Sequence, residues 1–166
     1  MFVGLAWNIR TFCCRNDLRA YDRARSKTDR MNRRPRILAI DDDPAQLELL
    51  ARGLAFEGFE VETREGPIGL TQLVRVFQPD IALVDIYIPT MKGDRIIELI
   101  RSAAHPETKY FVISSCSEED LRACALETNA HGWLPKGLPM NEMALRLRDS
   151  LARHRELVGP PSTRRM

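Results

Sequence analysis

The sequence predicts an α/β domain in which helices cover both faces of a parallel sheet. Two observations predict this class. Short apolar segments alternate five times with helical segments between residues 36 and 155, and several of the apolar segments are continuous runs, as expected of strands buried on both faces. The chain has 166 residues, of which 44% are hydrophobic and 29% charged, which is the profile of one globular domain.

The first elements follow from local signals. Residues 36–40 (RILAI) are an apolar strand, and Asp43 is expected to cap a helix that starts at Pro44 and stops at Gly58. Apolar residues recur at helical spacing between these two limits. The elements expected next are a strand at 59–63, a helix near 67–77 and a continuous apolar strand at 80–86.

The second half repeats the same alternation, with proline and glycine at the boundaries. The expected elements are a helix at 93–103, a strand at 110–114, a helix at 117–128, a short strand at 131–135 and a last helix at 140–155. Five strand–helix units thus fill residues 36–155, and the remaining residues 156–166 are expected to be a flexible tail with no room for an output domain.

The segment before the domain differs from it in charge. Residues 1–36 contain ten Lys and Arg but three Asp and Glu, whereas the whole chain carries a net charge of +2, so the rest is acidic. Residues 1–35 are predicted to be a basic, flexible arm, and a start at Met31 is an alternative that would remove most of it. The arm is a solvated extension or a contact for nucleic acid or anionic lipid; the domain itself is not expected to bind nucleic acid.

Targeting signals are absent from the sequence. No apolar run approaches the roughly 18 residues of a membrane helix, and the first ten residues lack the basic start of a secretory signal. The four cysteines, at positions 13, 14, 116 and 124, do not have the spacing of metal ligands or of a disulfide framework. We therefore expect a cytoplasmic protein with reduced thiols.

Polar residues follow four of the predicted strands. Asp41 and Asp42 follow the first strand, and Asp85 lies at the end of the third. Ser114 ends the fourth strand, and Lys136 follows the fifth. Because ligands of open parallel sheets bind beyond the carboxyl ends of the strands, we expect these side chains to converge there.

This set of groups suits phosphoryl transfer. Crowded carboxylates repel one another unless a cation neutralises them, and hard oxygen ligands suit Mg²⁺. An aspartate can act as a nucleophile and form an aspartyl phosphate. Such a reaction needs mainly positioning and charge neutralisation, for which a metal ion, a lysine and a hydroxyl are sufficient.

Four segments resemble the receiver domain of bacterial two-component response regulators. ILAIDDDP resembles the first strand of that family with its acidic pair, and DIALVDIYIPTMKG the phosphoacceptor segment. SSCSEED resembles the segment that opens with the switch Ser or Thr, and AHGWLPK the segment that runs from the switch aromatic to the lysine. Together they span about 120 residues in the family's order. The resemblance implies a flavodoxin-like (βα)5 fold with strand order 2-1-3-4-5.

The resemblance also assigns roles around the acidic residues. Asp85 is expected to be the phosphoacceptor. Asp42 and Asp85 are expected to bind Mg²⁺ together with the backbone carbonyl of Tyr87, and Asp41 to act through a water molecule. Lys136 is expected to pair with the phosphoryl group.

The switch residues follow in the same way. Ser114 is expected to turn towards a phosphoryl oxygen, and is preferred to Ser115 because its spacing to Lys136 matches the family without a gap. Trp133 occupies the position of the switch aromatic, although its size disfavours an inward rotation. Gly137 replaces the proline that commonly follows the lysine, which puts the coupling of the lysine to the last helix in doubt.

The function expected from the resemblance is a regulatory phosphoacceptor rather than an enzyme with an external substrate; it promotes only its own phosphorylation and dephosphorylation. Its partners would be a histidine kinase or a histidine phosphotransfer protein, and a separate target that contacts the face formed by residues 117–128, 131–135 and 140–155. The main alternative is a receiver-like adaptor with a vestigial site. A phosphatase of the haloacid dehalogenase type is disfavoured because DDDP lacks that family's alternation of acids with an apolar residue and Thr.

Overall fold

The computed structural model describes residues 33–89 and 91–157. Three predictions lie outside the described residues: the arm up to residue 32, the alternative start at Met31, and the tail from residue 158 onward. Among the residues that are described, no helix combines the length and the hydropathy needed to cross a membrane.

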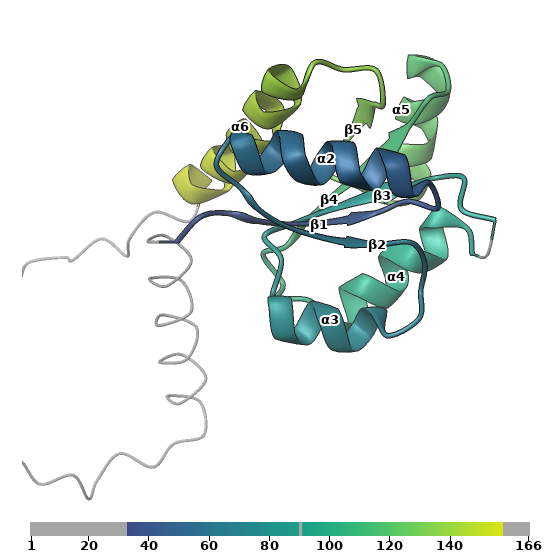
Figure 1. Ribbon diagram of the computed structural model, residues 1–166, viewed down its shortest axis with the longest axis horizontal. Helices are drawn as coiled ribbons and strands as arrows, with labels where there is room; N and C mark the ends of the chain where they lie inside the picture. The colour runs from purple at the N-terminus through teal and green to yellow at the C-terminus, as the bar shows by residue number, and fades with distance from the viewer. Residues whose placement is uncertain (1–32, 90, 158–166) are drawn as a thin grey trace, which may run out of the picture. The chain divides into compact units, whose positions relative to one another are not determined.

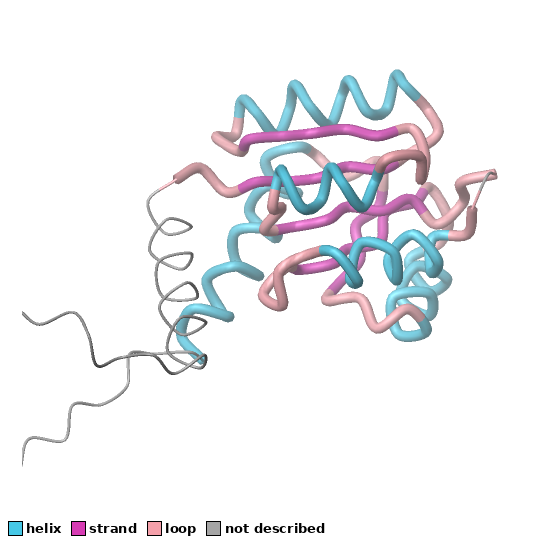
Figure 2. Tube along the Cα trace, turned by 90° about the horizontal axis from the view of Figure 1, so that it is seen from below, coloured by secondary structure: helices cyan, strands magenta, loops and turns pink. Residues whose placement is uncertain are grey.

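Five parallel strands form one sheet with the order β2-β1-β3-β4-β5, which confirms the predicted fold class (Figure 1). The strands are β1 (Arg36–Ile40), β2 (Glu60–Arg64), β3 (Ile81–Asp85), β4 (Lys109–Ser114) and β5 (Gly132–Pro135). The helices are α2 (Pro44–Phe56), α3 (Leu70–Phe77), α4 (Gly93–Ala103), α5 (Glu118–Glu127) and α6 (Met140–Leu157). Figure 2 shows helices on both sides of the strands.

The predicted helix limits hold where a capping group fixes them. The Asp43 side chain accepts a hydrogen bond from the Ala45 N–H at the start of α2, and Ser117 Oγ accepts one from the Asp120 N–H at the start of α5. After α2, Gly58 has a φ of 92°, which favours glycine and ends the helix.

Helix α3 starts later than predicted. The sequence pattern placed its start near residue 67, whereas the first helical residue is Leu70. Gly69 adopts the left-handed conformation with a φ of 71°, so the chain turns there before it enters the helix. Of the remaining elements, β1 and α4 have the predicted limits, and the others differ from theirs by one or two residues.

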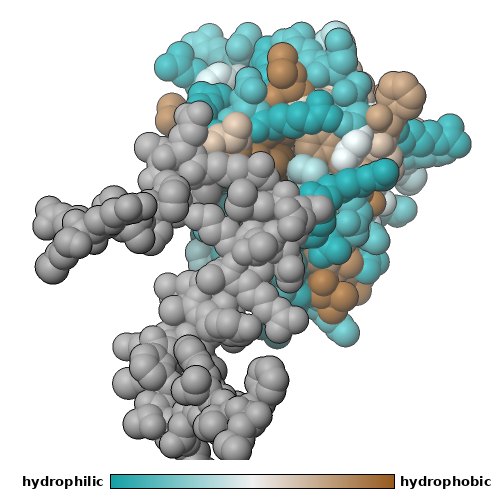
Figure 3. Space-filling model, turned by 90° about the vertical axis from the view of Figure 1, so that its left-hand side faces the viewer, coloured by the Kyte–Doolittle hydropathy of each residue, from teal (hydrophilic) through white to brown (hydrophobic). Residues whose placement is uncertain are grey.

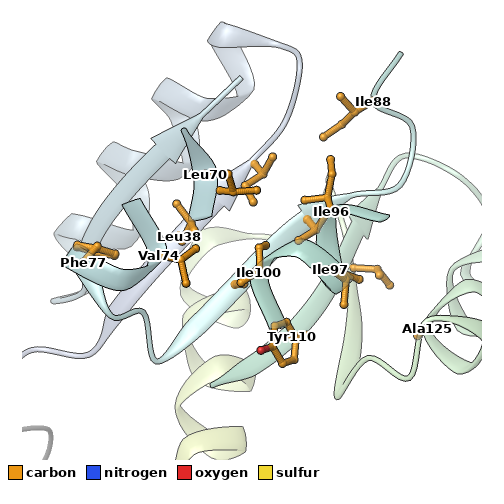
Figure 4. Packing of buried hydrophobic residues seen from close by; sticks show 14 of the residues in the cluster. Leu38, Leu70, Val74, Phe77, Ile88, Ile96, Ile97, Ile100, Tyr110 and Ala125 are labelled. Carbon is orange, nitrogen blue, oxygen red and sulfur yellow. The ribbon is translucent and has the colours of Figure 1, made fainter. Parts of the chain in front are cut away.

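Two hydrophobic cores lie on opposite faces of the sheet. Helices α3, α4 and α5 pack on one face, where their apolar side chains meet those of β1, β3 and β4 (Figure 4). Helices α2 and α6 pack on the other face. Strands β1 and β3 contribute alternate residues to both cores, which explains why their sequences are continuous apolar runs.

The exposed apolar side chains are scattered. Figure 3 shows separate hydrophobic patches among hydrophilic atoms on one face of the molecule. The large exposed residues come from different elements and include Phe56 at the end of α2, Ile68 before α3 and Val76 in α3. Single exposed apolar residues are normal on protein surfaces, so these carry no functional argument.

Candidate functional site

The carboxyl edge of the sheet brings the predicted site residues to one place. Asp41 directly follows β1, and Asp85 is the last residue of β3. Ser114 is the last residue of β4, and Lys136 follows β5. Because all five strands are parallel, the ends of these four strands share one edge.

Lys136 forms ion pairs with two buried aspartates. Its Nζ lies 2.6 Å from Asp41 Oδ2 and 3.0 Å from Asp85 Oδ2. The Asp41 side chain is fully buried, the Asp85 side chain is 5% exposed, and the Lys136 side chain is 13% exposed. One ammonium group therefore neutralises part of a charge that two buried carboxylates would otherwise carry alone.

The surroundings of Lys136 change the pKa of its ammonium group. Burial by itself lowers the pKa of Lys136, but its hydrogen bonds and its attraction to Asp41 and Asp85 outweigh burial and raise the pKa above the ordinary value of 10.5. Lys136 is therefore charged at neutral pH, and its charge is fixed between the two carboxylates.

The two aspartates use only part of their hydrogen-bonding capacity. Asp41 Oδ1 accepts a hydrogen bond of 3.0 Å from the Asp43 N–H, and Asp85 Oδ1 accepts one of 3.3 Å from the Tyr87 N–H. Asp41 Oδ2 is in contact with Lys136 Nζ at 2.6 Å, and no other described residue donates a hydrogen bond to it. A carboxylate oxygen can accept more than one such contact, so the remaining lone pairs of the two aspartates suit a further cationic ligand.

A third carboxylate completes an acidic pocket. Asp42 is exposed, and one oxygen each of Asp41, Asp42 and Asp85 lie within 4.8 Å of one another. Hard oxygen donors at this spacing fit Mg²⁺, which is commonly bound by one or two carboxylates and water. Tyr87 is two residues after Asp85 in the chain and is 65% exposed.

A close backbone contact holds the loop after Asp85 against α4. A Cβ atom on Gly93, the first residue of α4, would lie 2.9 Å from the Asp85 carbonyl oxygen and 3.1 Å from Ile86 Cα. Side chains do not tolerate such distances, so glycine is required there. The sequence marks this position only through its resemblance to the family, because the steric reason depends on the fold.

Ser114 is buried and makes a local hydrogen bond. Its Oγ accepts a hydrogen bond of 3.3 Å from the Cys116 N–H, and its carbonyl oxygen accepts one of 2.9 Å from the Lys136 N–H. Ser115 is exposed, in contrast to Ser114. The backbone of the predicted switch residue is thus bonded directly to the backbone of the lysine.

Trp133 is the second residue of β5, so it lies before the carboxyl edge at which the acidic residues and Lys136 meet. Its side chain is half-buried, packs against the core formed with α3, α4 and α5, and is paired in register with Val112 of β4. The structure thus brings together Asp41, Asp42, Asp85 and Lys136, and places Ser114 and Trp133 on the strands that lead to them. Sequence reasoning did not find the direct ion pair between Asp41 and Lys136, since it assigned Asp41 to a water-mediated role.

Comparisons with known proteins agree with this geometry. Residues 37–148 match the family model of the response regulator receiver domain. Response regulator MprA of Mycobacterium sp. (strain KMS) is 30% identical over 127 residues, which cover 76% of this chain and 55% of that protein. The same-named protein of Mycobacterium leprae (strain TN) is 30% identical over 118 residues, which cover 71% and 51%. The chain spans about half the length of these curated relatives.

Solved structures share the fold. The receiver domain protein (CheY-like) of Methanospirillum hungatei JF-1 superposes with a TM-score of 0.65 at 25% identity, covering 76% of this chain and 99% of that one. The chemotaxis protein CheY4 of Vibrio cholerae has a TM-score of 0.64 at 19% identity, covering 70% and 98%. Receiver domains are regulatory phosphoacceptor domains that bind Mg²⁺ in an acidic pocket and act with histidine kinases and downstream effectors. The chain belongs to the family of response regulator receiver domains, whose general function is that of a phosphorylation-dependent switch.

Proposed function

We propose that Asp85 accepts a phosphoryl group from a phosphohistidine of a histidine kinase or a histidine phosphotransfer protein, and that the modified domain signals to a separate protein. The observation that carries the proposal is the position of Lys136 Nζ between Asp41 and Asp85. Two buried carboxylates need a compensating cation in any case, and here that cation also lies where it can attract the oxygens of a phosphoryl group that reaches Asp85.

The transfer is a substitution at phosphorus. A carboxylate oxygen of Asp85 forms the new O–P bond, while the N–P bond of the donor breaks and its electron pair stays on the imidazole nitrogen. The Lys136 ammonium lies next to the acceptor carboxylate and attracts the phosphoryl oxygens as they arrive. Hydrolysis by water returns the free carboxylate and inorganic phosphate, so the chain acts on no substrate besides its own phosphoryl group.

The acidic pocket supplies the metal ligands in this proposal. Asp42 and Asp85 would bind Mg²⁺ directly, with the Tyr87 carbonyl as a third ligand and Asp41 acting through water. When bound, Mg²⁺ neutralises the negative charge that the carboxylates and the phosphoryl group bring together. The spare acceptor capacity of Asp41 supports the assignment, because Lys136 alone among the described residues contacts its Oδ2 and a lone pair is left for a water molecule.

The response begins at Ser114 and Lys136. A phosphoryl group has more acceptor oxygens than a carboxylate, so the Ser114 hydroxyl gains a partner and leaves the Cys116 N–H. The backbone bond between Ser114 and Lys136 then links the movement of β4 to the segment that leads into α6. The face formed by α5, β5 and α6, which carries Trp133, changes its affinity for the target protein.

Intact-protein mass spectrometry tests the proposal. The wild type and an Asp85→Asn variant are incubated with Mg²⁺ and acetyl phosphate, and a parallel sample receives beryllofluoride with Mg²⁺. We expect one phosphoryl group on the wild type and none on the variant. If the wild type takes neither the phosphoryl group nor beryllofluoride, the site is vestigial and the chain is a phosphorylation-independent adaptor.

A further inference from the structure

The imidazole of His131 attaches the start of β5 to β4. His131 directly precedes β5, and its Nδ1 accepts a hydrogen bond of 3.1 Å from the Tyr110 N–H. The His131 N–H donates a bond of 2.7 Å to the Tyr110 carbonyl oxygen. Both backbone groups of Tyr110 are thus bonded to the same residue, one to its backbone and one to its side chain. The imidazole takes the place of a backbone acceptor at the start of this parallel ladder.

The surrounding residues hold the imidazole in place. The His131 ring stacks on the Tyr110 ring, with 5.7 Å between the centroids and 28° between the planes. Arg101 of α4 lies over the Tyr110 ring at 5.0 Å from its centroid and donates hydrogen bonds to the carbonyl oxygens of Thr128 and Asn129. Tyr110 is part of the core on the side of α3, α4 and α5 (Figure 4), whereas His131 is exposed. Protons from the solvent therefore reach the imidazole.

The bond from Tyr110 depends on the charge of the imidazole. A neutral imidazole has one nitrogen that accepts a hydrogen bond, whereas both nitrogens of the imidazolium form donate. Because Nδ1 faces an N–H group, only the neutral form can make this bond. Histidine is the side chain that ordinarily changes its charge between about pH 5 and 8. The contribution of the bond is therefore present at the upper end of this range and is lost as the pH falls.

The charged groups around His131 disfavour a further positive charge. Three cations and one acid line the groove beside it: Lys109 of β4, and Arg146, Arg153 and Asp149 of α6. Arg101 adds a fourth positive charge next to Tyr110. The three residues between α5 and His131 are uncharged. Since like charges repel, these surroundings stabilise the neutral ring relative to the imidazolium form.

We propose that His131 is a proton-sensitive clamp: its neutral imidazole fixes the start of β5 on β4, and its protonation releases that start. Strand β5 has four residues and lies at the edge of the sheet, so one bond is a considerable part of its attachment. The same strand contains Trp133 and leads to Lys136. The inference goes beyond the proposed function, because none of the groups that form the clamp belongs to the acidic pocket.

A second histidine supplies a matched control. His105 Nδ1 accepts a hydrogen bond of 3.2 Å from the Glu107 N–H, so its chemistry is that of the clamp. That bond spans two residues of the turn after α4 and does not join two strands. His105→Asn therefore removes a titrating imidazole of the same kind without changing the attachment of β5.

Hydrogen exchange of the Tyr110 amide, followed by NMR from about pH 7.5 to about pH 5.5, tests the inference. Its protection factor, corrected for the intrinsic rate at each pH, is compared with that of Val112, which is paired in register with Trp133 further along the same two strands. The test variant is His131→Asn, because the amide oxygen can accept the same bond but takes up no proton in this range. His131→Ala removes the acceptor altogether.

In the wild type, the protection of Tyr110 relative to Val112 should fall about fivefold between the two pH values, as expected for the loss of one ordinary hydrogen bond. His131→Asn should show no such fall, and His131→Ala should have the low ratio at both pH values. His105→Asn should respond like the wild type.

Three results would overturn the inference. The first is a wild-type ratio that does not change with pH, and the second is a fall in His131→Asn as large as in the wild type. The second result would assign the proton to another group, such as Lys109, whose pKa is lowered by burial. The third is a response that disappears in His105→Asn. Urea unfolding shows whether the variants are folded, and if His131→Ala is not, the comparison of the wild type with His131→Asn decides.

A further variant separates the clamp from the proposed function. Asp85→Asn removes the proposed phosphoacceptor, which lies at the opposite edge of the sheet from His131. This variant should keep the pH response of Tyr110, and a loss of the response there would contradict the clamp. Failure of acetyl phosphate to label the wild type would remove the phosphoacceptor and leave the clamp unaffected.

Discussion

Buried aspartates lie at both edges of the sheet, but the groups that bind their carboxylates differ between the two edges. At the amino edge, Asp80 Oδ2 accepts a hydrogen bond of 2.8 Å from the Arg36 N–H, and the Asp80 backbone bonds to Arg36 and Lys109. At the carboxyl edge, Asp41 and Asp85 each accept one hydrogen bond from a backbone N–H nearby in the chain, and their other carboxylate oxygens face a lysine side chain. Asp80 joins the beginnings of β1, β3 and β4 through backbone groups that cannot leave.

The difference separates a structural acid from a reactive one. A carboxylate that accepts a hydrogen bond from a backbone N–H of a neighbouring strand, in a residue whose own backbone is paired on both sides, has a fixed partner and stabilises the sheet. A carboxylate opposite a lysine keeps free acceptor capacity, and its partner can turn to a new ligand. Burial alone does not distinguish the two edges, since Asp80 is 7% exposed and Asp85 is 3% exposed.

The largest expected effect is the loss of phosphorylation when the aspartate at the carboxyl edge is replaced, but not when the aspartate at the amino edge is. Asp85→Asn should remove phosphorylation by acetyl phosphate completely, because a neutral amide lacks the anionic oxygen with which a carboxylate attacks phosphorus. Asp80→Asn should keep it, and should lower the free energy of unfolding by about 1 kcal/mol through a weaker bond to the Arg36 N–H. Intact mass and urea unfolding measure the two effects. Labelling of Asp85→Asn at the wild-type level would show that another residue is the acceptor.

The second prediction concerns the lysine. Lys136→Met leaves Asp41 and Asp85 buried without their cation, and should lower the free energy of unfolding by about 3 kcal/mol without divalent metal. Adding Mg²⁺ should restore part of the loss. A second variant, Lys136→Met with Asp41→Asn, serves as the control and should recover stability without metal, because one of the two charges is gone. Urea unfolding measures the stability of all three proteins. The prediction is contradicted if the double variant is the least stable of them.

Two glycines test how rigidly each edge is packed. An alanine Cβ at Gly93 would meet the Asp85 backbone, whereas one at Gly132 would lie 2.7 Å from the ring of Phe111. A ring can shift and a carbonyl in the sheet cannot, so Gly93→Ala should cost about 2 kcal/mol and Gly132→Ala about 1. Gly137→Ala, with nothing within 4 Å of its Cβ, is the neutral control. Equal losses at Gly93 and Gly132 in thermal unfolding would show that the loop after Asp85 is not held by this contact.

The smallest predicted effect is on the pH dependence of stability. The pKa of Lys136 is raised in the folded state above 10.5, so its pairing stabilises the fold fully below about pH 10.5 and is lost as the pH rises through the higher folded value. Burial also raises the pKa of Tyr110, against the opposing effect of Arg101, and so adds a loss of the same sign. Tyr110 is present in both wild type and Lys136→Met, so the difference between their stability curves isolates the lysine. That difference should shrink above pH 10.5, and a difference that grows would refute the assignment.

The sequence was sufficient to predict the carboxyl edge because strand ends can be read from apolar runs and their polar boundaries. Asp41, Asp42, Asp85 and Lys136 were expected together, and they lie together. The start of α3 was predicted too early, because the periodicity does not reveal that Gly69 adopts a left-handed conformation. The ion pair of Asp41 with Lys136 and the contact of Gly93 with Asp85 depend on distances between segments that are far apart in the chain. No local pattern encodes such distances.

The central position of β1 also shapes how the chain folds as it is synthesised. β1 pairs with β2, about one helix away in sequence, and with β3, whose Ile81 lies opposite Ile37. A nascent chain that ends before β3 can form only one of these pairings, and leaves the other backbone edge of β1, whose last four residues are apolar and buried, without its neighbour. Contacts of such separation form late and slowly, and unpaired apolar edges associate with other chains. Ribosome-bound fragments that end between β2 and β3 therefore expose an edge of β1 to chaperone binding or aggregation, and completion of β3 should cover that edge of β1.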